Sequence, residues 1–485
     1  MFEFVKKIGS RLSPDYGLQK AMDSAIYTTQ MRYAVSSSIE SWAPGKPLKL
    51  LFAGYAGSRN TGADVRVEEM IRQIRHLLGD ENIALSIMTI DTEATRGYFS
   101  TVTQLEVPQI FPPFLYSECP KHHGVIACEG SMFKSKFADA LSVMMAGSLG
   151  MANAERKLSI GYGAEAGAMT PTLKHFVQKQ CRDSLVICRN EESQEVLQKI
   201  NIRTRPGADT AWTFTPSPKS VGEKILKEKG WDGKQDILMV CPINPFWWPV
   251  KANVVKRIQN IAVGKYKDQH YKSIYFHDYN KQDQKSYETY IQALAKSAKR
   301  FATEHNLFVA AVGMEKLDRR ACEDFSKAFG SEQLPPVIVS DQYHMYDMIS
   351  ILRKAKFMVS SRFHAIVCSM PGQVLSVGVT MDERIRNLMN LRGHENLYTE
   401  VDDQQLEHNV YQMLSDCHQH QKKYQEDMCK TVVGEMKKMA DMGKDFLEEL
   451  KRVYPEFASK HQGRDWQSYL PQLSDDLTSM VEKYS

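Results

Sequence analysis

Short runs of apolar residues alternate with amphipathic stretches along this chain, from residue 48 to about residue 400. A short apolar run bounded by turn residues is typical of a buried strand, and apolar residues spaced three and four apart are typical of a helix. Strands that alternate with helices predict parallel sheets, and therefore an α/β fold. The predicted strands are Leu48–Ala53, Ala84–Ile90, Gly124–Cys128, Lys157–Gly161, Leu185–Cys188, Asp236–Cys241, Tyr271–His277, Leu307–Gly313, Val337–Ser340, Phe357–Val359 and Val374–Val379.

This alternation is interrupted once, by the charged stretch 216–233. Each side of the interruption has its own series of strands, so we predict two doubly wound, Rossmann-like domains. The end of the chain has Glu/Lys pairs and few strand-forming residues, which indicates helices packed across both domains. The predicted segments are an N-terminal helical extension (1–47), an N-terminal Rossmann-like domain (48–215), a linker (216–235), a C-terminal Rossmann-like domain (236–400) and a helical C-terminal extension (401–485).

The composition excludes several classes of protein. The 485 residues carry a formal net charge of +4, too small to indicate a nucleic-acid partner by itself. The nine cysteines lack paired spacing and most lie in apolar runs, which favours buried thiols in a reducing cytosol and no zinc site. Residues 1–30 lack the apolar core of a signal peptide, so we expect a soluble, cytoplasmic protein. Two alternatives stay open at this point: residues 1–47 contact the inner face of a membrane or do not, and the protein forms a homo-oligomer or does not.

The stretch 356–379 carries the most suggestive chemistry. An apolar strand, Phe357–Val359, gives way through two serines to Arg362 and His364 and then to a short helix. In open α/β folds ligands bind at this edge of the sheet, and the start of a helix favours anions. A cation beside a titratable imidazole suits a phosphorylated substrate that must also receive a proton. The alternative is that Arg362 pairs with a structural carboxylate and that His364 is a core histidine.

Further polar loops follow other strands of the first predicted domain. The first strand opens into a glycine loop that contains Gly54, Gly57 and Asn60, which is neither a dinucleotide fingerprint nor a P-loop. Such a loop either lets a ligand approach the backbone or makes a tight turn. Arg189 follows the strand Leu185–Cys188, as Arg362 follows its own strand.

Three adjacent aromatic residues, 246–248, follow the strand Asp236–Cys241 in the second domain. Aromatic rings in a loop suit stacking on a sugar, and Trp247 is our candidate for this contact. The alternative is that the rings fill the crease between the domains.

Five segments that follow predicted strands, taken in order along the chain, resemble motifs of the polysaccharide pyruvyl transferase family. The matching segments are GYAGSRNTGAD (54–64), CEGS (128–131), GYGAEAG (161–167), RNEES (189–193) and SSRFHA (360–365). The chain departs from the family pattern where Ala63 precedes Asp64, where Glu129 replaces a glycine, and where Glu165 and Ala166 stand in the third glycine loop.

The resemblance implies a GT-B-like pair of domains with the active site in the cleft. It implies transfer of the enolpyruvyl group of phosphoenolpyruvate (PEP) onto two hydroxyls of a glycan or lipid-linked saccharide, giving a pyruvate ketal and phosphate. Catalysis would fall to His364 as acid and to Arg362, and no metal or other cofactor is expected. The candidate substrate-binding residues are Arg189, Gly54, Gly57, Asn60, Gly130, Ser131, Gly163 and Trp247.

Two other functions fit the same features. A GT-B glycosyltransferase that uses a nucleotide sugar would share the fold and would also need glycine loops and an arginine. A catalytically inactive carbohydrate-binding protein is the third alternative, which is suggested by Glu129 in place of a glycine and by the long terminal extensions.

Overall fold

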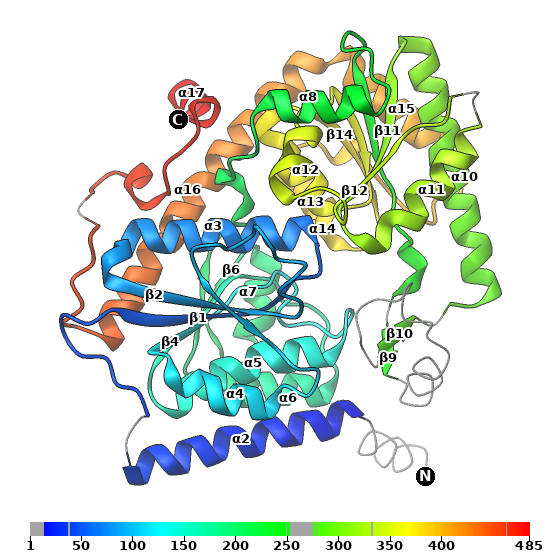
Figure 1. Cartoon of the computed structure of the whole chain (residues 1–485). Helices are drawn as coiled ribbons and strands as arrows, with labels where there is room; N and C mark the ends of the chain where they lie inside the picture. The colour runs from blue at the N-terminus through cyan, green and yellow to red at the C-terminus, as the bar shows by residue number, and fades with distance from the viewer. Residues whose placement is uncertain are drawn as a thin grey trace.

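The computed structural model contains two parallel sheets with interleaved helices (Figure 1), which confirms the predicted α/β class and its two Rossmann-like halves. The structure describes residues 14–36, 39–248, 250–252, 275–277, 279–330, 333–461 and 463–485. Within them, no helix is long and apolar enough to cross a membrane.

The first sheet has seven strands, all parallel, in the order β3-β2-β1-β4-β5-β6-β7. The strand order reverses between β1 and β4, and in doubly wound sheets such a switch point leaves a crevice in which ligands bind. The strands are β1 (Leu48–Ala56), β2 (Ile83–Thr89), β3 (Thr103–Glu106), β4 (Gly124–Ala127), β5 (Leu158–Ala164), β6 (Leu185–Cys188) and β7 (Arg203–Pro206).

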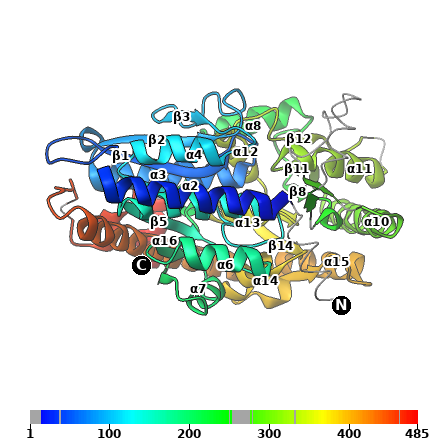
Figure 2. The ribbon, with the colours of Figure 1, turned by 90° about the horizontal axis from the view of Figure 1, so that it is seen from below.

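Successive apolar residues of β1 face opposite sides of this sheet, because side chains alternate along a strand. Leu50 and Phe52 join one hydrophobic cluster, together with α3 (Thr61–Leu78), while Leu51 and Ala53 join another. The second cluster lies under α5 (Asp139–Ala154), which α2 (Pro14–Ser36) covers as an outer layer (Figures 1 and 2). The other helices of this half are α4 (Pro112–Glu118), α6 (Pro171–Gln180) and α7 (Glu191–Gln198).

The second sheet has six parallel strands in the order β12-β11-β8-β13-β14-β15, with its own switch point between β8 and β13. A short antiparallel pair, β9 (Val250–Ala252) and β10 (Tyr275–His277), stands apart; residues 271–274 of the predicted strand Tyr271–His277 lie outside the described residues. The sheet strands are β8 (Ile237–Cys241), β11 (Phe308–Gly313), β12 (Val337–Val339), β13 (Phe357–Ser360), β14 (Leu375–Thr380) and β15 (Tyr398–Glu400). The helices are α8 (Lys219–Glu228), α10 (Lys281–His305), α11 (Arg319–Phe329), α12 (Met345–Leu352), α13 (Phe363–Ser369), α14 (Glu383–Leu391) and α15 (Leu406–Gln419).

The predicted helical C-terminal extension is confirmed. Helix α16 (Gln421–Val453) is 33 residues long and contacts α3, β5 and β7 of the first half and β14 of the second. It lies with α15 along one side of the molecule, while α2 covers another (Figure 2). Helix α17 (Asp475–Tyr484) packs on α16.

The apolar pattern of the sequence predicts a helix over Phe133–Gly147, and this prediction is wrong in its bounds, because α5 begins only at Asp139 and ends at Ala154. The backbone before it is held in a loop by side-chain bonds: the Ser142 hydroxyl donates to the Lys134 carbonyl at 3.0 Å. The strands β3, β7 and β15 were not predicted, since they are short, lie at sheet edges and lack apolar runs.

Candidate active site

A cavity of about 70 Å³ lies where the two halves of the molecule meet. From the first half it is lined by residues of the β1 and β4 loops, by the start of α3 and by Arg189 after β6. From the second half it is lined by residues 361–364, between β13 and α13, and by residues before and within α14. Six of the ten predicted site residues line this cavity: Asn60, Gly130, Ser131, Arg189, Arg362 and His364.

The junction of β13 and α13 is built by two serines. The Ser360 hydroxyl accepts a hydrogen bond from the Arg362 amide at 3.0 Å and donates one to the Arg362 carbonyl at 2.8 Å. Ser361 instead shares a hydrogen bond of 2.7 Å with the Tyr290 hydroxyl. These bonds fix the backbone so that the chain turns from strand to helix with Arg362 and His364 at the cavity.

Arg362 is held by two carboxylates. Its Nε donates to Asp318 Oδ2 at 2.8 Å and its Nη2 donates to Glu315 Oε2 at 3.0 Å, with a further bond from Nη2 to Asp318. Burial raises the pKa of Asp318 to about 6, although Arg362 acts in the opposite direction. The Arg362 guanidinium therefore lines the cavity and is also paired with structural carboxylates. It combines the two alternatives that the sequence left open for this residue.

His364 contacts groups of the other half of the molecule. Its Nε2 lies 3.2 Å from Asp209 Oδ2, and its imidazole lies over Gly62, where an added Cβ would stand 2.4 Å from the ring. Burial lowers the pKa of His364 to about 4, and Asp209 offsets only part of this effect. The ring is therefore neutral at pH 7, with Nε2–H donating to the Asp209 carboxylate and Nδ1 able to accept a proton.

Asp209 is the centre of a buried charge cluster. Its Oδ2 lies 3.0 Å from Arg66 Nε and 3.2 Å from Arg189 Nη1, in addition to His364. Burial raises the pKa of Asp209, but Arg66, His364 and Arg189 outweigh burial and hold this pKa well below its usual range. Asp209 therefore stays ionised and fixes three cavity side chains together.

Arg189 is almost fully buried and pairs with both Glu165 and Asp209. Burial lowers the pKa of Arg189 to about 9. Its guanidinium also lies 5.0 Å from the centre of the Phe363 ring, which belongs to the second half. Arg189 and Arg362 thus lie at one cavity, as the resemblance implied.

The four remaining predicted residues lie outside the cavity lining, each for a visible reason. Gly57 has a φ of 99° in a turn that packs on the Asp91 backbone. The Gly163 carbonyl accepts a hydrogen bond of 2.6 Å from Arg66, so this glycine positions a cavity residue. Trp247 is half-buried with its ring 6.5 Å from that of Tyr279. Gly54 lies against Glu129, where an added Cβ would stand 3.0 Å from Oε1.

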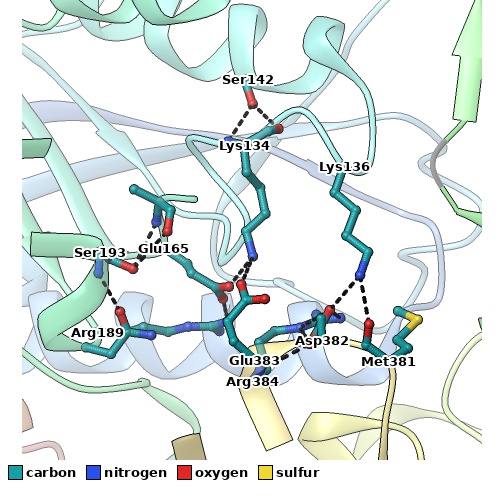
Figure 3. Close-up of polar contacts among 12 residues, drawn as sticks. Lys134, Lys136, Ser142, Glu165, Arg189, Ser193, Met381, Asp382, Glu383 and Arg384 are labelled. Atoms are coloured by element: carbon teal, nitrogen blue, oxygen red, sulfur yellow. Dashed lines mark hydrogen bonds and ion pairs between the residues drawn. The ribbon is translucent and has the colours of Figure 1, made fainter. Parts of the chain in front are cut away.

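Beside the cavity, the loop 131–138 of the first half is tied to the start of α14 in the second (Figure 3). Lys134 pairs with the buried Glu165 and with Glu383 Oε1, 3.1 Å away. Lys136 Nζ donates to the Met381 carbonyl at 3.2 Å. Burial lowers the pKa of Lys134 to about 8. We name this group of contacts the interdomain clamp.

Sequence reasoning missed Arg66 and Arg384, which line the cavity, and Asp209, which pairs with Arg66 from outside the lining. Arg66 stands between Val65 and Val67 in the apolar run of α3, where an arginine with 1% exposure signals a buried partner. An arginine within an apolar run can be noticed in the sequence, but the carboxylate with which it pairs cannot be identified there.

Comparisons with known proteins agree with the motifs. The model of a family described as polysaccharide pyruvyl transferase matches residues 149–370, somewhat less than half of the chain, which confirms the resemblance and supports a transferase. A comparison with curated proteins found no match.

Several solved structures resemble this chain at low identity. The UDP-GlcNAc 2-epimerase from Neisseria meningitidis bound to UDP-GlcNAc is 10% identical, with a TM-score of 0.49 and coverage of 83% of this chain and 100% of that one. The S. aureus MnaA–UDP structure is 10% identical, with a TM-score of 0.47 and coverage of 87% and 100%. Phytolacca americana UGT2, complexed with UDP-2fluoro-glucose and pterostilbene, is 8% identical, with a TM-score of 0.46 and coverage of 84% and 100%.

Proposed function

We propose, from the polysaccharide pyruvyl transferase match over residues 149–370, that this protein transfers the enolpyruvyl group of PEP onto two hydroxyls of a sugar. The products are a pyruvate ketal and phosphate, and the acceptor is a polysaccharide or its lipid-linked precursor. The observation that carries the proposal is the convergence of Arg66, Arg189, Arg362 and His364, from both halves of the molecule, on one cavity.

The donor chemistry suits these arginines. PEP carries a phosphate of roughly −1.5 to −2 charge and a carboxylate, so it requires more than one cation. Guanidinium forks match the paired oxygens of both groups. Because Arg362 is now paired to Asp318 and Glu315, the donor would take the place of these carboxylates. Protonation of Asp318 weakens its hold, and the pKa of about 6 brings that protonation within reach of neutral pH.

The resemblance implied that His364 is the acid, but burial keeps its ring neutral at pH 7, so we propose instead that it acts as a base at the reacting carbon. Its neutral imidazole can take the proton of the attacking sugar hydroxyl, and the resulting imidazolium is stabilised by Asp209. The same proton can then go to the departing phosphate. Asp209 therefore orients the ring and supports its charged state, while Gly62 leaves the space in which the ring lies.

The experiment that tests this function is a donor screen. PEP should raise the thermal midpoint of the protein, and with a saccharide acceptor it should release phosphate, because a ligand that binds the folded state stabilises it. Arg189→Lys keeps the charge but loses the fork, so PEP should bind it more weakly. Stabilisation by a UDP-sugar alone would instead identify a glycosyltransferase, and stabilisation by neither donor would identify a carbohydrate-binding protein.

The acceptor side of the proposal rests on Trp247 and its neighbours. Trp247 and Trp248 are half-buried, and the Trp248 ring lies 5.0 Å from that of Phe137 in the first half. Trp247→Ala should therefore weaken acceptor use more than PEP binding. An equal loss of both, with a large fall in melting temperature, would show that the ring serves packing.

We further propose that the protein works at the cytoplasmic face of a membrane, where lipid-linked saccharides are found, and that α2 contacts the lipid surface. On α2, Tyr27, Met31 and Val35 lie four residues apart and are 63%, 48% and 84% exposed. The charged side chains of the same stretch, Asp23 and Arg32, are paired inward with Lys179 and Glu155. The preceding residues 1–13 contain Phe2, Phe4 and Val5 among Lys6, Lys7 and Arg11.

Co-flotation with vesicles of phosphatidylcholine and phosphatidylglycerol tests this contact. The protein should float with the vesicles, and a variant with Tyr27→Ser, Met31→Ser and Val35→Ser should bind less. Absence of wild-type binding, or equal binding by the variant, would contradict the proposed contact.

A further inference from the structure

We propose that Glu129 is the acid that protonates the methylene carbon of the donor, a catalytic residue for the reaction proposed above. The inference rests on that proposed function, and it concerns a residue that stands where the family pattern has a glycine. A glutamate at this position was one reason to consider an inactive protein. Its place in the structure supports the opposite conclusion.

Glu129 lies two residues after the end of β4, at the switch point where the loops after β1 and β4 part. It is 2% exposed and lines the cavity that Arg362 and His364 reach from the other half of the molecule. Its Oε1 accepts a hydrogen bond from the Tyr55 amide at 3.3 Å. Gly54 makes room for this carboxyl group, since a Cβ there would approach Oε1 to 3.0 Å.

Glu129 differs from the other acids near this site because its carboxyl group belongs to the cavity lining. Of the described residues that line the cavity, Glu129 alone carries a carboxyl group. The carboxylates that neutralise the arginines, such as Asp209, Glu315 and Asp318, are outside this lining. An acid that must touch the donor is therefore found at Glu129 and not at these counter-ions.

The surroundings of Glu129 favour the protonated form. Burial raises the pKa of Glu129, and Arg66 and the Tyr55 and Gly130 backbone amides act against this rise. The groups that face it electrostatically are Tyr55 on β1, Asp64 and Arg66 on α3, and Cys128, which follows β4. The pKa of His364 moves the other way. Two titratable groups at one site whose environments push their pKa values apart are the mark of an acid and a base.

The proton balance closes with these two residues. Glu129 gives its proton to the methylene carbon of PEP, the carbon–carbon double bond becomes a carbon–hydrogen bond, and the neighbouring carbon is attacked by the first sugar hydroxyl, whose proton goes to His364. The bond from that carbon to the phosphate oxygen then breaks, the electron pair leaves with the phosphate, and His364 gives its proton to the phosphate. The second hydroxyl attacks the same carbon and returns a proton to the Glu129 carboxylate.

The decisive variant is Glu129→Gln, because an amide keeps the shape and the oxygen that accepts from the Tyr55 amide but cannot protonate carbon. Phosphate release from PEP with an acceptor should fall about 10²–10⁴-fold, the usual contribution of a general acid. PEP binding, measured by calorimetry, should stay within about threefold of wild type. Glu69→Gln is the matched control: Glu69 is fully buried with a raised pKa but lies outside the cavity lining, and its turnover should be unchanged.

The pH profile and a second variant separate catalysis from structure. In the wild type, kcat should fall at high pH as Glu129 loses its proton, and the residual activity of Glu129→Gln should lack this limb. Glu129→Gly restores the glycine of the family pattern and should be as slow as Glu129→Gln. Wild-type turnover in either variant would overturn the assignment. Absence of PEP binding or turnover in the wild type would instead contradict the proposed function itself.

Discussion

At the scale of single residues, each arginine at the cavity already has a carboxylate partner. Arg66 and Arg189 share Asp209, and Arg362 holds Asp318 and Glu315. Removing one member of a buried ion pair leaves an uncompensated charge, which costs more than the pair contributes. Substitution of an arginine at this cavity is therefore expected to change both the stability of the fold and the binding of the donor. Neutral substitutions at His364 allow these two effects to be measured separately.

His364→Ala should reduce turnover about 10²–10⁴-fold while PEP binding stays within roughly tenfold, because the arginines that hold the donor remain. His364→Gln should be nearly as slow, since an amide cannot carry the proton. Steady-state phosphate release and calorimetric titration with PEP measure the two quantities. Turnover like that of wild type in His364→Ala would remove this residue from catalysis.

Gly62 is expected to be intolerant of a side chain because of His364. A methyl group at Gly62 would lie 2.4 Å from the imidazole, so the ring or the whole second half must shift. Gly62→Ala should therefore lower turnover by at least tenfold, since positioning within about 1 Å decides such rates. Gly434→Ala on α16 is the matched control, because nothing lies within 4 Å of its added methyl group. That control should gain about 0.5–1 kcal/mol of stability in urea unfolding and keep its activity.

The residues found at the cavity show what sequence can and cannot predict. Arg189, Arg362 and His364 follow buried strands, and the carboxyl ends of parallel strands meet at one edge, so their proximity was predictable. Asp209 was not, because its partner His364 lies 155 residues away in the other half of the molecule. Contacts between the two halves follow from how they dock, and no local pattern encodes that docking.

At the scale of elements, the interdomain clamp holds the β4–α5 loop against the start of α14 (Figure 3). Lys134 has a side-chain exposure of only 3%, and it lies between Glu165 of one half and Glu383 of the other. This loop depends on its ion pairs, because without them its charged groups would be buried with no partner, which costs free energy.

Lys134→Met should destabilise the protein by about 3–5 kcal/mol, the usual result of breaking a buried ion pair. Lys121→Met is the matched control: Lys121 pairs with Glu118 at the surface, and its loss should cost less than about 1 kcal/mol. Denaturant unfolding followed by circular dichroism measures both. Equal, small effects would show that the clamp is not needed for stability.

Helices and strands with long or fully apolar patterns were predicted well. Strands that lack such a pattern were missed. Strand Leu185–Cys188 agrees with its prediction at both ends, since it is buried on both faces. Edge strand β7 reads Arg-Thr-Arg-Pro and is defined by pairing with β6, not by its own composition. The predicted bounds of α5 were wrong because the interdomain clamp holds the residues before this helix in a loop, although Phe133 and its neighbours have an apolar pattern.

At the scale of the whole molecule, the buried histidines make stability depend on pH. Burial lowers the pKa of His123, His364 and His394 to about 4, below the ordinary value of about 6.5. Between pH 4 and pH 6.5 each of these histidines binds more protons in the unfolded chain than in the folded one, so its contribution to stability rises with pH, whereas Asp318, whose pKa burial raises to about 6, acts in the opposite direction. The contribution of the three histidines is complete above about pH 6.5 and is lost as pH falls towards 4.

Thermal unfolding measured from pH 7 to pH 4 should therefore show a steep fall in midpoint. Each pKa unit corresponds to about 1.4 kcal/mol, so each histidine contributes on the order of a few kcal/mol. His394→Gln, at a residue outside the cavity lining, should flatten the fall without changing the PEP-dependent shift at pH 7. A midpoint that stays constant down to pH 5 would contradict the expectation.

The path of α16 has a consequence for how the protein is made. Residues 421–453 leave the ribosome only after both sheets have emerged, yet Phe446 packs on Tyr162 of β5 and Met442 on Gly207 in the first half. Until then the part of that face formed by β5 and β7 lacks the cover of α16, and a nascent chain with exposed apolar surface is a substrate for chaperones and prone to aggregate. A stop codon or a prolonged pause before residue 420 would accordingly yield no partly active fragment. It would yield a first sheet that is only partly covered, and such a fragment is expected to be degraded.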